Sequence, residues 1–182
     1  MQVDMRLLGT VELHVQGRDA TPGAAKRRAV LTALALGANR PVSLDRLCEV
    51  AWAGAPPASA VANLRSHAMG LRKSLGGRLM ARSNAYELRL ATGELDVNRF
   101  HRLASEGRGD LAAGDPASAI GKLLTALSLW RGRLARVFRR ALSWTATEPL
   151  TYGDLSVRSS LAAGAAGPLR RRGGRLPPRV AR

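Results

Sequence analysis

Apolar and polar residues alternate near the start of the chain. The alternating apolar positions, interrupted at Gly9, are Met5, Leu7, Val11, Leu13 and Val15. A period of two places successive side chains on opposite faces of a strand. This stretch therefore predicts a short antiparallel strand pair with one buried face, closed by Gly17-Arg18.

After Pro22-Gly23 the spacing of apolar residues becomes helical. Residues 29–36 are apolar on nearly all sides, which predicts a central buried helix. Ser43 is a good N-cap for a second helix, with Asp45 in its first turn, where the helix dipole favours a carboxylate. The prolines and glycine within Ala53–Ser59 break that helix and predict a loop.

The longest amphipathic stretch is Ala58–Leu75. Its apolar stripe recurs at three- and four-residue steps: Val61, Leu64, Ala68, Leu71 and Leu75. Gly76-Gly77 ends this predicted helix. The following residues, Leu79–Leu90, alternate again, with Tyr86, Leu88 and Leu90 on one side, and predict a β-hairpin.

Two further helices are predicted beyond Gly93. Apolar spacing marks them within residues 100–111 and 120–130, with Asp115 as the cap of the second and Pro116 at its first position. The pair looks like one repeat of a helical solenoid, of which about three are normally needed to bury a core. We therefore expect an incomplete all-α module.

The remaining residues do not continue this pattern. Leu134–Trp144 is a candidate for one more basic amphipathic helix. Past Pro149 the chain consists largely of Arg, Gly, Ala, Pro and Ser, without periodic apolar residues that would form a core. We expect this basic tail to be disordered.

Charge divides the chain into three parts. The 182 residues carry Lys+Arg 29 and Asp+Glu 13, a formal charge of +16. Residues 1–93 contribute +7 (13 basic, 6 acidic), residues 94–130 contribute −1 (4 and 5), and residues 131–182 contribute +10 (12 and 2). This excess favours a polyanion as the partner, because neutralising phosphates requires cations.

Several functional classes are disfavoured. A lone cysteine, Cys48, excludes a disulfide framework and a cysteine-rich zinc site, and the three histidines lack the spacing of metal ligands. No apolar run approaches the ~18–20 residues of a membrane span, and Asp4 precedes any basic run that would open a signal peptide. We expect a cytoplasmic, nucleoid-associated protein without metal or cofactor. An enzyme is the least favoured class, because no catalytic constellation stands out.

A strand pair, three helices and a hairpin, in this order, predict an α+β winged helix-turn-helix. In this fold one helix enters the major groove of DNA and the hairpin lies beside it. Ala58–Leu75 is the expected reading helix. The candidate DNA-contacting residues are Lys26, Arg27, Asn63, Arg65, Ser66, His67, Met69, Arg72, Lys73, Arg82 and Arg89. A solvated surface is the alternative for the charged residues, and a packing role is the alternative for His67.

Several motifs also occur in the order of a known family. They are Arg6-Leu7-Leu8-Gly9, Lys26-Arg27-Arg28-Ala29-Val30-Leu31, Asn39-Arg40-Pro41-Val42-Ser43-Leu44-Asp45-Arg46-Leu47, Ala51-Trp52, Ala62-Asn63-Leu64-Arg65-Ser66-His67, Leu71-Arg72-Lys73-Ser74-Leu75-Gly76-Gly77, Tyr86-Glu87-Leu88, Gly93-Glu94-Leu95-Asp96, Leu111-Ala112-Ala113-Gly114-Asp115-Pro116-Ala117 and Ala126-Leu127-Ser128-Leu129-Trp130-Arg131-Gly132. Together they resemble the Streptomyces antibiotic regulatory protein (SARP) family. In that family an OmpR-like winged helix precedes a bacterial transcriptional activation domain of tetratricopeptide-like helices. The resemblance covers residues 5–132.

The resemblance implies a transcriptional activator of an antibiotic or other secondary-metabolite gene cluster. Family members bind direct repeats of double-stranded DNA upstream of promoters as side-by-side protomers. They recruit RNA polymerase partly through the loop between the second and third helices, which here corresponds to Ala53–Ser59.

The chain departs from the family pattern at three places. Met69-Gly70 stands where family members usually have Ser-Arg, and Ala85 replaces the glycine that usually precedes the tyrosine of the hairpin. The helical module also stops after about one repeat. The sequence after Gly132 resembles an out-of-frame translation of GC-rich DNA, so we hypothesise that the chain is a truncated or frameshifted family member. Sequencing the gene tests this. If no other reading frame encodes the missing helices, the hypothesis is contradicted.

The sequence thus predicts a winged-helix domain over residues 1–92, the start of an activation domain over 93–132 and an Arg-rich tail over 133–182. Two other functions stay open. One is sequence-indifferent binding of nucleic acid through the tail, in which case deleting residues 133–182 abolishes binding. The other is a non-activating partner that forms mixed complexes with an intact paralogue.

Overall fold

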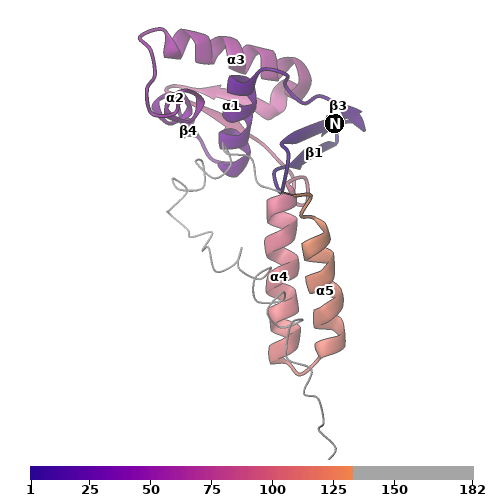
Figure 1. The fold of residues 1–182 in the computed structure, drawn as a ribbon. Coiled ribbons are helices and arrows are strands. Elements are labelled where there is room, and N and C mark those ends of the chain that lie inside the picture. The colour runs from indigo at the N-terminus through magenta and orange to yellow at the C-terminus, as the bar shows by residue number, and fades with distance from the viewer. Residues whose placement is uncertain (133–182) are drawn as a thin grey trace, which may run out of the picture.

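The computed structural model describes residues 1–132. Two small three-stranded sheets and three helices form the N-terminal part, and two long antiparallel helices extend away from it (Figure 1). Both parts share one apolar core of mostly Leu, Val and Ala side chains, which agrees with the few aromatic residues in the chain. The sequence-based prediction for Leu134–Trp144 and for the tail lies outside the described residues.

The first sheet has the order β1-β2-β3, with strands at Val3–Arg6, Glu12–Val15 and Arg18–Asp19. Strands β1 and β2 pair antiparallel with Met5 opposite Leu13, and both of these side chains are buried. The alternating pattern therefore predicted this pair correctly. The two-residue strand β3 was not expected.

Helices α1, α2 and α3 span Ala25–Leu36, Leu44–Trp52 and Ala60–Leu75. The hydroxyl of Ser43 accepts a hydrogen bond from the Arg46 N–H at 3.3 Å, as expected of an N-cap. The loop between α2 and α3 covers residues 53–59, as predicted. Helix α3 begins two residues later than the sequence pattern indicated, because Ala58 and Ser59 still belong to the loop's last turn.

The second sheet has the order β4-β6-β5, with strands at Val42–Ser43, Leu79–Arg82 and Ala85–Leu88 in the order β4, β5, β6. Strands β5 and β6 form the predicted hairpin, with Leu79 opposite Leu88. Strand β4 was not predicted. It pairs Val42 with Tyr86 and so fixes the start of α2 to the hairpin.

Helices α4 and α5 span Asp96–Ala112 and Pro116–Ser128. The Asp115 carboxylate accepts a hydrogen bond from the Ser118 N–H at 3.1 Å, and Pro116 occupies the first turn, as predicted. Trp130 lies just beyond the end of α5. Its ring meets the ring of Phe100 edge-on, with 6.2 Å between the ring centroids. None of the helices in residues 1–132 is long and apolar enough to cross a membrane.

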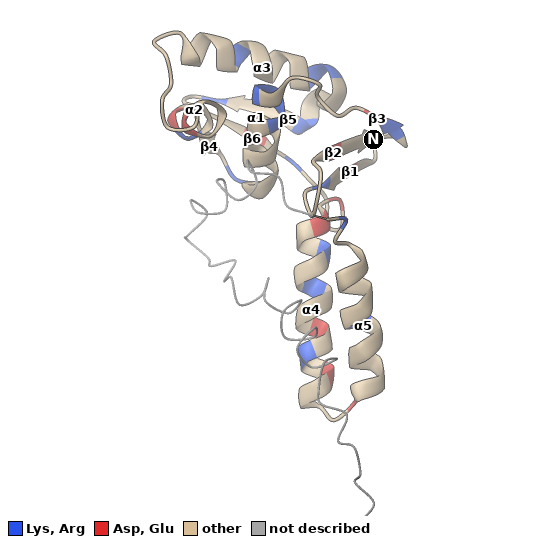
Figure 2. Cartoon of the chain, viewed as in Figure 1, with Lys and Arg blue, Asp and Glu red and all other residues tan. Residues whose placement is uncertain are grey.

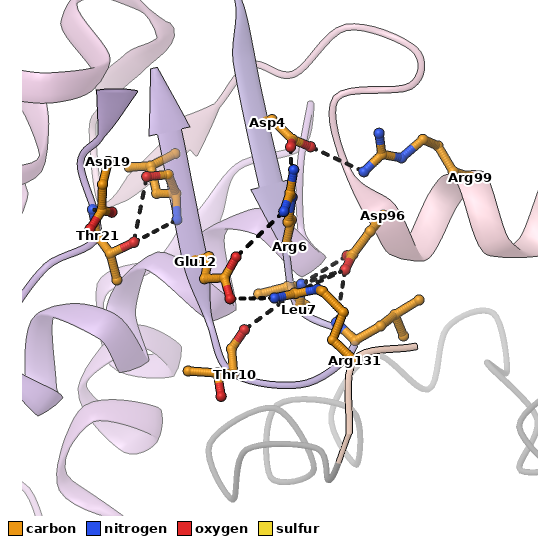
Figure 3. A network of polar contacts seen from close by, with 12 residues as sticks. Asp4, Arg6, Leu7, Thr10, Glu12, Asp19, Thr21, Asp96, Arg99 and Arg131 are labelled. Atoms are coloured by element: carbon orange, nitrogen blue, oxygen red, sulfur yellow. Dashed lines mark hydrogen bonds and ion pairs between the residues drawn. The ribbon is translucent and has the colours of Figure 1, made fainter. Parts of the chain in front are cut away.

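A buried polar joint connects the helical pair to the first sheet (Figure 3). The Asp96 carboxylate, at the start of α4, accepts hydrogen bonds from the backbone N–H groups of Leu7 and Leu8 at 2.8–2.9 Å. The Arg131 side chain reaches back to Glu12 and lies 3.6 Å from Asp96. Burial raises the pKa of Asp96, although the N–H donors and Arg131 act in the opposite direction.

Backbone contacts reinforce this joint. The Arg131 N–H donates to the Leu8 carbonyl at 2.8 Å, and the Met5 N–H donates to the Glu94 carbonyl at 2.7 Å. Gly9 has φ +141°, and a Cβ there would lie 3.1 Å from the Cβ of Arg131. Glycine at this position therefore allows the segment after α5 to approach the β1–β2 turn closely.

Candidate nucleic-acid interface

One face of α3 is exposed and mostly polar. Its exposed members include Asn63, Arg65, Ser66, Met69, Arg72 and Lys73. The opposite face is buried against the core through Leu64, Ala68, Leu71 and Leu75. Met69 is an apolar side chain on the exposed face with 67% of its surface accessible.

The electrostatic environment of this face is one-sided. The sequence from Val50 to Tyr86 contains no Asp or Glu. Figure 2 shows Lys and Arg on α3 and no acidic residue there. The cations of the helix therefore have no carboxylate on their own element to neutralise them.

Basic residues differ in their surroundings across the described chain. Near the first sheet and α4, five arginines are paired with carboxylates: Arg6, Arg78, Arg99, Arg102 and Arg131. Among residues 1–132, no carboxylate pairs with the cations on or against α3: Lys26, Arg27, Arg65 and Lys73. Arg72 differs from these, because its Nε donates to the Leu79 carbonyl at 2.9 Å and so ties α3 to β5.

Residues from α1 and α2 extend this cationic face. The Lys26 ammonium lies 4.8 Å from the centroid of the Trp52 ring, within the range of a cation–π interaction. The same ring lies 6.2 Å from the ring of His67 on α3. Burial, followed by the charges of Arg27 and Lys26, lowers the pKa of His67. Two cations from α1 therefore gather beside His67 of α3, next to the Trp52 ring of α2.

The hairpin presents two arginines that share one acid. Glu87 is buried and accepts hydrogen bonds from Arg82 at 2.8 Å and from Arg89 at 3.1 Å. These bonds lower the pKa of Glu87. The alternating pattern placed Glu87 on the side opposite Tyr86 and gave no sign that it is buried. Arg82 and Arg89, the two hairpin residues predicted to contact DNA, therefore each form an ion pair with Glu87.

The structure brings most of the predicted residues together. Lys26 and Arg27 from α1 adjoin His67 and the exposed face of α3, whereas Arg82 and Arg89 lie in a separate hairpin cluster. Sequence reasoning missed Trp52, Gly70 and Glu87 as parts of these clusters. Trp52 and Gly70 contact residues on other helices, which a short-range pattern does not show. For Glu87 a local signal existed, because Arg89 follows it by two residues on the same side of the strand. Within residues 1–132, no group of three or more His, Cys, Asp or Glu side chains could hold a metal ion.

Comparison with known proteins shows the family to which the chain belongs. A family model described as the bacterial transcriptional activator domain matches residues 95–166. The transcriptional regulatory protein EmbR of Mycobacterium tuberculosis is 35% identical over 138 residues, which cover 72% of this chain and 36% of EmbR. The transcriptional regulator RedD of Streptomyces coelicolor is 35% identical over 139 residues, 71% of this chain and 39% of RedD. The chain belongs to the SARP family.

The fold of this SARP chain also matches a solved structure. The structure of EmbR from Mycobacterium tuberculosis, in complex with a low affinity phosphopeptide, has a TM-score of 0.72 and 31% sequence identity. The match covers 91% of this chain and 44% of that one. The SARP chain thus spans less than half the length of EmbR and RedD.

The activator-domain match extends past the predicted boundary at Gly132. It continues to residue 166, through part of the segment that the sequence analysis interpreted as an Arg-rich tail.

Proposed function

We propose that this SARP protein is a sequence-specific DNA-binding transcriptional regulator, of the activator type, for a secondary-metabolite gene cluster. In this proposal residues 1–92 form a winged helix-turn-helix, with α3 in the major groove and the β5–β6 hairpin beside it. Residues 93–132 begin a tetratricopeptide-like activation domain. The regulator acts in the cytoplasm at the nucleoid.

The observation that carries the proposal is the exposed face of α3. Within residues 1–132 its cations lack carboxylate partners, and its other exposed groups suit the reading of bases. Asn63 and Ser66 are hydrogen-bonding side chains, and Met69 is an exposed apolar group able to contact a thymine methyl. Cations such as Lys73 supply the phosphate contacts from which most affinity for DNA arises.

The proposed partners follow from family membership. The operator is a direct repeat upstream of a promoter, occupied by side-by-side protomers. RNA polymerase contacts the loop Ala53–Ser59, every residue of which is exposed. The Asp96 joint ties the α4–α5 pair to the first sheet, next to the DNA-binding part of this proposal.

Selection from a pool of duplexes with a randomised centre tests the proposal. The full chain and the fragment 1–132, which retains Arg131 and hence the joint, are each selected against the pool and then measured over a salt series. Enrichment of the same direct repeat by both proteins is the expected result.

Two results would contradict the proposal. If only the full chain binds, without sequence preference and with a steep salt dependence, the Arg-rich tail carries sequence-indifferent binding. If neither protein binds DNA but the full chain forms mixed complexes with an intact paralogue, the chain is an interaction partner and not a regulator on its own.

A further inference from the structure

The guanidinium of Arg27 crosses from α1 onto the surface of α3. It lies directly against Gly70, where a Cβ would come within 2.6 Å of Arg27 Cζ and 2.9 Å of Nε. Any residue other than glycine at this position would therefore displace the guanidinium. A side chain from another helix thus fills the place that residue 70 of α3 leaves empty.

No acidic group described in the structure neutralises this guanidinium. Arg27 Nε is buried and has no hydrogen-bond partner within residues 1–132. The neighbouring groups are the ammonium of Lys26 and the ring of His67, whose Nδ1 is also buried and unpartnered. Arg27 as a whole is only partly buried, and a partly buried cation without a carboxylate beside it attracts anions. The counter-charge is therefore expected from a bound anion.

We propose that Arg27, positioned by Gly70, binds one backbone phosphate of the DNA beside α3. The planar guanidinium matches the geometry of a phosphate, and its place beside the helix backbone suits a contact that sets the register of the protein on the duplex. Such a contact carries no sequence preference. This inference rests on the proposed DNA-binding function and adds a requirement for glycine at position 70.

The test compares Arg27→Ala, Gly70→Ala and the double variant in the full chain. Affinity is measured by fluorescence anisotropy on the selected duplex and on random duplex over a salt series. Arg27→Ala is expected to weaken binding about tenfold on both duplexes and to lower the slope of log K against log salt by about one. The preference between the two duplexes stays unchanged.

Gly70→Ala separates the proposed contact from an effect on folding. Alanine is a better helix former than glycine, so the thermal stability of this variant should stay the same or rise. Its DNA affinity should nevertheless fall, because the added methyl displaces the guanidinium. In the Arg27→Ala background the same change should have no further effect, since the displaced group is already absent.

Two controls make failure interpretable. Arg102→Ala removes one positive charge from α4 and should leave the salt slope unchanged. NMR titration of His67 tests the cluster without DNA: Arg27→Ala should raise the pKa of His67, because a nearby cation is removed.

The proposal is overturned if Arg27→Ala leaves the salt slope unchanged, or if the effects of Arg27→Ala and Gly70→Ala add. It is also overturned if the pKa of His67 does not respond to Arg27→Ala. Absence of any enriched duplex would refute the proposed regulatory function instead. The phosphate contact would then still be measured on random duplex, because it does not depend on sequence.

Discussion

Arg72 and Lys73 are adjacent cations on α3 with different surroundings. Arg72 Nε donates to the Leu79 carbonyl, whereas Lys73 has no ion-pair partner within residues 1–132. From the sequence alone, Arg72 and Lys73 were equivalent candidates for contacting DNA. Their environments indicate that one also holds α3 against the hairpin, while the other is available to a ligand.

Substitution of each residue by alanine should separate these roles. Lys73→Ala is expected to weaken DNA binding several-fold without changing the midpoint of thermal unfolding. Arg72→Ala should weaken binding and also lower the free energy of unfolding by about 1 kcal/mol, because an intramolecular hydrogen bond is lost. Anisotropy and thermal denaturation measure the two effects. Equal stability of both variants would show that the Arg72–Leu79 bond contributes little.

A second prediction at the residue scale concerns Ala53, the residue that ends α2. It adopts a left-handed conformation with φ 63°, which is unfavourable for a residue with a Cβ. Ala53→Gly should raise the free energy of unfolding by about 0.5–1 kcal/mol. Ala58→Gly, in the same loop and without a positive φ, serves as the matched control and should give no gain in urea denaturation.

At the scale of elements, the sequence predicted the helices and the hairpin but not the two-residue strands. The five α-helices of residues 1–132 and the β5–β6 hairpin each carry several apolar residues at a regular spacing. Strands β3 and β4 have two residues each, too few to show a period. They exist because a partner strand offers backbone hydrogen bonds, which is information that a local pattern does not contain.

The hairpin should respond to pH through Glu87. Hydrogen bonds from Arg82 and Arg89 hold the pKa of Glu87 below its ordinary value, so the folded state binds this proton more weakly than the unfolded state. The stabilisation is therefore present above about pH 4.3, the ordinary value for glutamic acid, and is lost as the pH falls through the lower value in the folded protein.

Carboxyl NMR titration of Glu87 measures this effect. The midpoint should lie below the ordinary value of about 4.3 for glutamic acid, and Arg82→Ala should raise it. An unchanged midpoint in Arg82→Ala would mean that Arg89 alone sets the pKa.

At the scale of the whole molecule, Asp96 and Arg131 decide how the two parts are joined. The sequence predicted a domain boundary near residue 93 and gave no indication of contacts between the two domains. The structure shows a buried carboxylate that binds the β1–β2 turn and an arginine after α5 that returns to the same turn. The α4–α5 pair is therefore part of one apolar and polar core with the N-terminal part.

Asp96→Ala tests this joint. The change leaves the N–H groups of Leu7 and Leu8 buried without acceptors, so we expect a loss of about 2–4 kcal/mol in the free energy of unfolding. Glu106→Ala, which removes an exposed ion pair with Arg102 on the same helix, should cost less than about 1 kcal/mol. Urea denaturation measures both. A loss no larger for Asp96→Ala than for Glu106→Ala would contradict the role of the joint.

The sequence by itself determined the order of the helices and the hairpin, the caps of α2 and α5 and the cationic character of α3. These features depend on residue spacing and on neighbours within one or two turns. Tertiary structure alone decided which cations remain without carboxylates, that Glu87 and Asp96 are buried, and that Arg27 lies on Gly70. Each of these depends on groups brought together from distant parts of the chain, because packing and desolvation are set by contacts in space and not by position along the sequence.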